Sequence, residues 1–73
     1  MSIFDRISGR YANARTDQER LGIVRAALED LHTLYGEIDS VRTYFQQARD
    51  HLTTEDHQGV FTYIGIIDGV AHL

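Results

Sequence analysis

Apolar positions in this chain recur mostly at steps of three and four residues, which is the spacing of one helix face. The first such stripe comprises Ile3, Phe4, Ile7 and Tyr11. It predicts a short amphipathic helix over residues 2–13, with Ser2 at the position of an N-terminal cap. Gly9 weakens this prediction, because glycine costs about 1 kcal/mol relative to alanine inside a helix.

A capping box at residues 16–19 marks the start of the next helix. Thr16 can accept a hydrogen bond from the backbone amide of Glu19, while the Glu19 side chain reaches back to the amide of Thr16. Asp17 and Glu19 also place negative charge at the positive end of the helix dipole. This is the clearest local signal in the chain.

Two overlapping heptad seams follow the capping box. The first seam comprises Leu21, Val24, Leu28, Leu31, Tyr35 and Ile38, and the second comprises Leu34, Ile38, Val41, Phe45, Ala48 and Leu52. The apolar flank changes near Gly36, and heptad drift of about 20° per repeat does not produce such a jump. We therefore expect a hairpin of helices at residues 17–35 and 40–53, with Gly36 in the left-handed capping conformation. One continuous helix is the alternative.

Residues 60–73 form the most apolar stretch of the chain, and on a helix they are apolar on two sides. Val60, Ile64, Ile67 and Ala71 fall on the first side, and Tyr63, Ile66, Val70 and Leu73 fall on the second. Such a helix is normally buried. Thr53 or Thr54 can cap it. A strand over residues 60–67 is the alternative, because this stretch is rich in strand-favouring residues, although no other segment offers a comparable partner strand.

These elements predict an all-α fold in which residues 1–73 form a single small helical bundle. It has a short N-terminal helix, a central helical hairpin or long helix, and a buried apolar C-terminal helix. A chain of 73 residues hides only about 60% of its unfolded surface, and without cysteine it has no disulfide to compensate. We therefore expect a homodimer or higher oligomer. The expected contact is the second side of the last helix, at Tyr63, Ile66, Val70 and Leu73.

The distribution of apolar and charged residues also bears on the cellular location of the protein. Asp5, Arg6 and Arg10 interrupt any apolar run near the start, so no signal peptide is expected. No apolar run approaches the roughly 20 residues that a membrane span needs. The sequence predicts a soluble, cytoplasmic protein with no membrane partner.

Charge is unevenly distributed within a net charge of −4. Residues 1–28 carry five arginines against three acids, whereas residues 29–73 carry two arginines against eight acids. Arginines such as Arg6 and Arg10 would suit a regulator that binds nucleic acid. The acidic residues of segment 29–73 would suit a protein that mimics nucleic acid. The N-terminal arginines do not share one face and the chain is acidic overall, so a nucleic-acid partner is not favoured.

Two groups of residues raise the question of metal-dependent chemistry. Glu29 and His32 have the Glu-x-x-His spacing of di-iron bundles, and residues 50–57 concentrate two histidines with three acids. The first lacks further inward-facing carboxylates, and the second matches no zinc or calcium motif. There is also no serine elbow, cysteine nucleophile or phosphate loop. We expect no metal and no cofactor, and a metal-dependent bundle enzyme is the least favoured function.

Tyrosine and arginine side chains are the strongest candidates for contacts with another molecule, because they dominate interface hot spots. The candidates for binding a partner are Arg6, Arg10, Tyr11 and Tyr44. The sequence therefore favours a small non-enzymatic protein-binding module that acts as a homo-oligomer. An adaptor, regulator or inhibitor of this size and charge would suit a bacterial or phage accessory protein.

Overall fold

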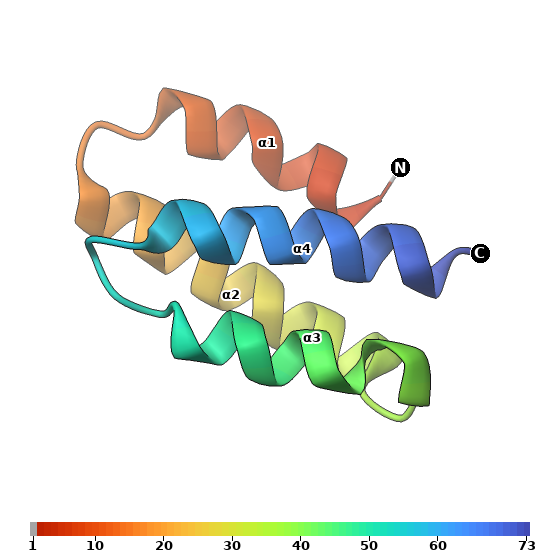
Figure 1. The fold of residues 1–73 in the computed structure, drawn as a ribbon. Coiled ribbons are helices and arrows are strands. Elements are labelled where there is room, and N and C mark those ends of the chain that lie inside the picture. The colour runs from red at the N-terminus through yellow and green to blue at the C-terminus, as the bar shows by residue number, and fades with distance from the viewer. Residues whose placement is uncertain (1) are drawn as a thin grey trace.

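A computed structural model describes residues 2–73, and these residues form four helices (Figure 1). The helices are α1 (Ile3–Asn13), α2 (Asp17–Tyr35), α3 (Asp39–Asp50) and α4 (His57–Ala71). The predicted all-α fold is therefore confirmed. Residues 60–67 lie within α4, so the strand alternative for this segment is wrong.

The apolar helix α4 is the element against which the others are arranged. It packs chiefly on α3 and α2, while α1 packs on α2 and touches α4 less. The consecutive helices α2 and α3 make few contacts with each other. Figure 1 shows α4 running in front of α2, with both chain ends and the α2–α3 turn at the same end of the bundle.

The core is built mainly from the sides that the apolar spacing predicted, but Leu34 and Ile38 of the two predicted seams are exposed, at 62% and 38%. On the first side of α4, Val60, Ile64 and Ile67 are fully enclosed and Ala71 is half-buried. Every helix contributes to the core, which also includes Ile3, Ile7, Val24, Ala27, Leu28, Leu31, Val41, Phe45 and Ala48. Burial of these apolar side chains is the main force that holds the four helices together.

The central segment is a hairpin, as favoured, but the conformation predicted for its glycine is wrong. Gly36 has φ −62° and ψ −20°, in the right-handed helical region. Its backbone N–H donates to the carbonyl oxygen of His32 at 2.9 Å. A Cβ atom at this position would lie 2.4 Å from the same oxygen. Glycine suits the position because the chain passes close to the last turn of α2, not because φ is positive.

The caps of the first two helices agree with the sequence in most details. The Asp5 amide donates to Oγ of Ser2, and the Glu19 amide donates to Oγ1 of Thr16, each at 3.1 Å. The reciprocal half of the predicted capping box differs. Oε2 of Glu19 accepts from the backbone N–H of Arg15 instead of that of Thr16. The carboxylate thus stabilises the connection before the helix.

The connection between α3 and α4 is longer than expected. We predicted a helix to residue 53, whereas α3 ends at Asp50, because the amides of His51 and Leu52 bond to carbonyl groups three residues back and tighten the chain. Thr53 does not cap α4. Its Oγ1 accepts from the amide of Asp56 and closes the turn before the helix, and α4 has no side-chain cap of its own.

The buried residue Asp68 joins the beginning of α1 to the end of α4. Its side chain, on a residue only 4% exposed, accepts a hydrogen bond from the Phe4 amide at 3.2 Å. This amide is one of the N–H groups that a helix N-terminus leaves without an intrahelical partner. Asp68 therefore caps α1 from a position 64 residues away in the sequence.

Replacing Asp68 by asparagine keeps the shape of the side chain and removes its charge. We expect the free energy of unfolding to fall by about 1 kcal/mol, because a carboxylate at a helix N-terminus accepts a stronger bond and complements the dipole. Urea denaturation measures the change. Asp30→Asn removes the same charge from the exposed middle of α2 and should change stability by less than about 0.5 kcal/mol. Equal losses in both variants would contradict the capping role.

Candidate functional site

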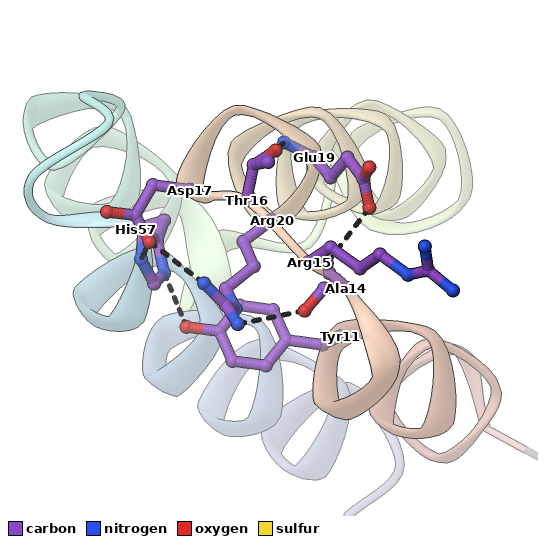
Figure 2. Close-up of polar contacts among 8 residues, drawn as sticks. All are labelled: Tyr11, Ala14, Arg15, Thr16, Asp17, Glu19, Arg20 and His57. Carbon is purple, nitrogen blue, oxygen red and sulfur yellow. Dashed lines mark hydrogen bonds and ion pairs between the residues drawn. The ribbon is translucent and has the colours of Figure 1, made fainter.

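A chain of polar contacts connects α1, α2 and α4 at the end of the bundle opposite the two termini (Figure 2). The hydroxyl of Tyr11 lies 2.5 Å from Nδ1 of His57, and Nε2 of the same ring lies 3.2 Å from Oδ1 of Asp17. Arg20 donates to that carboxylate oxygen at 2.9 Å and to the backbone carbonyl of Ala14 at 2.8 Å. A carboxylate only accepts, so in the neutral ring Nε2 carries the proton and Nδ1 accepts from the tyrosine hydroxyl.

The order hydroxyl, imidazole, carboxylate is that of a nucleophilic triad, but the electrostatics do not favour that chemistry. Burial raises the pKa of Tyr11, opposed by the nearby Arg20 guanidinium. Nδ1 of His57 is placed to act as a base toward this hydroxyl, but activation of a nucleophile is usually accompanied by a lowered pKa, which is the opposite direction. The Tyr11 ring also stacks on Phe61 with centroids 4.2 Å apart. This polar chain is best understood as a brace between three helices.

Tyr11 was one of the residues that we expected to contact a partner. The structure places its ring half-buried against α4 and its hydroxyl in the contact with His57. Its polar handle is thus already used inside the molecule.

The two groups considered for metal binding are separated or used elsewhere. His51 pairs with Asp56, whereas His57 bonds to Tyr11 and Asp17, so the two histidines have different partners. Glu29 and His32 are exposed, and the His32 ring meets the edge of Phe45. In residues 2–73 no group of three histidine or acidic side chains is arranged to hold a metal ion.

The second apolar side of α4, comprising Tyr63, Ile66, Val70 and Leu73, is only partly covered. Ile66 is 37% exposed and Leu73 is fully exposed, while Tyr63 and Val70 are half-buried. Tyr63 lies beside α3, where its ring is 6.5 Å from that of Tyr44 and stacks on His51 at 5.5 Å. The residues that we expected in an oligomer contact are therefore available at the surface to different degrees.

The arginines separate into two sets. Arg20 and Arg42 form ion pairs with Asp17 and Asp39, each three residues before them. Within residues 2–73 the structure gives no ion pair to the others, which are Arg6, Arg10, Arg15, Arg25 and Arg49. Four of these five line hollows along α2. Arg6 and Arg10 lie between α1 and α2, and Arg25 and Arg49 lie between α2 and α3.

Of the three hollows that these arginines line, the one between α2 and α3 has the largest volume. It has a volume of about 460 Å³, with Leu28 and Leu52 among its lining residues and Arg25 and Arg49 on its two helices. It exists because α2 and α3 both pack on α4 and make few contacts with each other.

The carboxylate of Asp68 has one oxygen, Oδ1, without a hydrogen-bond partner among the described residues. Nδ1 of His72 lies 3.3 Å away, but it bonds to the backbone carbonyl of Asp68 at 2.7 Å. Nε2 of His72 in turn contacts the Tyr35 hydroxyl at 3.2 Å. His72 is exposed and connects the ends of α2 and α4.

Comparisons of the chain with protein-family models, curated proteins and solved structures give no match. None of the helices formed by residues 2–73 is long and apolar enough to cross a membrane.

Arg6 and Arg10 were predictable from the sequence as candidates for binding a partner, whereas the hollow at Arg25 and Arg49 and the buried Asp68 were not. The arginine pair is 24 residues apart in the sequence, and only the fold of the hairpin brings it together. Asp68 sits one position from the buried Ile67 in an apolar segment, and that placement was the available signal. A lone acid in such a segment normally has a partner when it is buried.

Proposed function

We propose that this protein is a non-enzymatic protein-binding module that assembles with a second copy of itself. The observation that carries the proposal is the only partly covered second apolar side of α4, with Ile66 37% exposed in the middle of the most apolar helix. Leaving such a side in water forfeits roughly 25 cal/mol for each Å² of apolar surface that an interface would bury. Tyr44 and Tyr63 at its edge are of the residue type enriched in interface hot spots.

The size of the chain supports self-association. At 73 residues the core is small, and small domains without disulfides commonly gain stability by oligomerising. A second copy offers the same apolar side, so a two-fold contact between two α4 helices is self-complementary. Adaptor, regulator and inhibitor roles all fit such a module.

Introducing charge on this side is expected to separate the copies. Wild-type protein should show the mass of a dimer or larger assembly in light scattering, and Ile66→Asp with Val70→Asp should give the 8.3 kDa monomer. An unpaired carboxylate in a desolvated contact costs several kcal/mol. Ile66→Asp alone, at the more exposed of the two positions, is the variant to use if the double change unfolds the chain.

Thr43→Asp is the matched control, because Thr43 is exposed and belongs to α3 instead of the second apolar side of α4. It should leave the mass of the assembly unchanged. A wild-type protein that is monomeric at all concentrations, or a double variant that keeps the wild-type mass, would contradict self-association through α4.

A further inference from the structure

We infer that the outer face of α2 is a docking site for an acidic, amphipathic helix of a partner protein. This inference names the partner class for the proposed binding function and therefore rests on that function. It uses a surface other than the second apolar side of α4. The docking face consists of an outer stripe on α2 and the arginines beside it. The stripe comprises Gly22, Ala26, Glu29 and Thr33, and the arginines are Arg6, Arg10, Arg25 and Arg49.

The outer stripe of α2 is uncovered, and three of its four residues, Gly22, Ala26 and Thr33, have small side chains. All four of its residues are exposed, and a Cβ atom added at Gly22 would meet nothing within 4 Å. Small side chains let a second helix approach closely, because helices pack ridge into groove at axis separations of about 8–10 Å. Of the other helices, α4 packs on the opposite, buried side of α2, where Val24, Leu28 and Leu31 lie.

Charge on this face points to an anionic partner. Arg6 and Arg10 flank the stripe on the α1 side, and Arg25 and Arg49 flank it on the α3 side. None of these four forms an ion pair within residues 2–73. Guanidinium groups bind carboxylates through two parallel hydrogen bonds, so acidic side chains along both edges of a docked helix match them.

Apolar residues beside the arginines favour a protein helix over a phosphate backbone. Ile23 lines the hollow on the α1 side and Leu52 lines the hollow on the α3 side, and both are half-buried. Leu34, which is 62% exposed, extends this apolar surface at one end. A phosphate backbone has no apolar group to place there, and Glu29 and Asp30 between the arginines repel a continuous line of phosphates.

The test is fluorescence anisotropy with a labelled helical peptide of about 18 residues. The peptide carries leucine at helix spacing along one side and glutamate along both edges. A second peptide has glutamine in place of every glutamate. We expect the glutamate peptide to bind at least about tenfold more tightly, as a few ion pairs would produce. Equal affinity for the two peptides, or no binding of either, overturns the inference.

Arg25→Glu with Arg49→Glu is expected to weaken binding of the glutamate peptide by about tenfold or more. Arg15→Glu with Arg42→Glu changes the net charge by the same amount away from the docking face and should have little effect. Equal weakening in both double variants would show attraction by net charge alone and overturn the site. Circular dichroism confirms that each variant is folded.

Two further measurements test for a nucleic-acid partner and separate peptide binding from self-association. A labelled DNA duplex that binds more tightly than the glutamate peptide, with the same dependence on Arg25 and Arg49, replaces the protein partner by nucleic acid. The Ile66→Asp variant should bind the peptide as wild type does, and Arg25→Glu with Arg49→Glu should keep the wild-type mass. Peptide binding and the mass of the assembly are thus measured independently. Loss of peptide binding alone means that the docking site fails, and a monomeric mass alone means that self-association fails.

Discussion

Replacing Ile64 by alanine is expected to lower the free energy of unfolding by about 3 kcal/mol. Ile64 is fully buried in the middle of α4, so the substitution removes three carbon atoms from the packed core and leaves a cavity. A domain of this length has a total stability of roughly 4–11 kcal/mol. The variant should therefore unfold at a much lower urea concentration, measured by circular dichroism.

Ile66→Ala, two residues further along the same helix, is the matched control. Its side chain is 37% exposed in the single chain, so the loss should be no more than about 1 kcal/mol. The comparison also reports on assembly. If Ile66 is buried between two copies, the effect of Ile66→Ala grows with protein concentration, because association adds to the stability of the folded state. Equal losses for Ile64→Ala and Ile66→Ala in dilute protein would contradict the described core.

Replacing Gly65 by valine is expected to destabilise the protein by about 2 kcal/mol. A Cβ atom at Gly65 would lie 2.9 Å from the ring of Phe4, so the branched side chain forces α1 away from α4. That ring also packs on Phe61, with centroids 4.9 Å apart. Movement of α1 would further lengthen the hydrogen bond from the Phe4 amide to Asp68. Thermal unfolding measures the effect.

Gly69→Val is the control for this prediction, one turn further along α4. A Cβ atom there meets nothing within 4 Å, and the position is exposed. Valine is a better helix former than glycine, so we expect a gain of about 0.5 kcal/mol. The same substitution at the two glycines should thus have opposite signs. A loss at Gly69 as large as that at Gly65 would point to the properties of valine and not to the contact with Phe4.

The features of the fold that follow from short-range patterns were predictable. Val60, Ile64 and Ile67 share a side of α4 because a helix repeats every 3.6 residues, and burial of that side follows from their apolar character. The caps at Ser2 and Thr16 are equally local, since each involves an amide three residues on. The hairpin was favoured over a long helix because the apolar flank changes near Gly36.

The predictions about caps and turns that were wrong have a common cause. In each case several hydrogen-bond partners or conformations compete for the same residue. Glu19 has two backbone amides within reach, and the path of the connection before α2 brings that of Arg15 closer. Thr53 has the side chain of a cap, but the two tight turns after Asp50 move the start of α4 on to His57. Gly36 tolerates both hands of helix, so its identity alone does not select one.

The candidate sites also differ in whether a local sequence pattern or the tertiary arrangement creates them. The second apolar side of α4 is periodic and was visible in the sequence. The hollow at Arg25 and Arg49 depends on α2 and α3 each preferring α4 to one another, which no local pattern encodes. The brace from Tyr11 to His57 spans 46 residues and likewise depends on the tertiary arrangement.

Because the two chain ends lie close together, the helices can be connected in a different order along the chain. Ser2 and His72 line the same hollow, and both ends emerge at one end of the bundle in Figure 1. A short glycine-serine linker can therefore join them, while new termini are opened in the exposed turn at Thr53, Thr54 and Glu55 at the opposite end. Such a circular permutant keeps every helix intact and makes α4 the first helix of the chain. The cap that Asp68 provides to α1 would then become a contact between neighbouring elements.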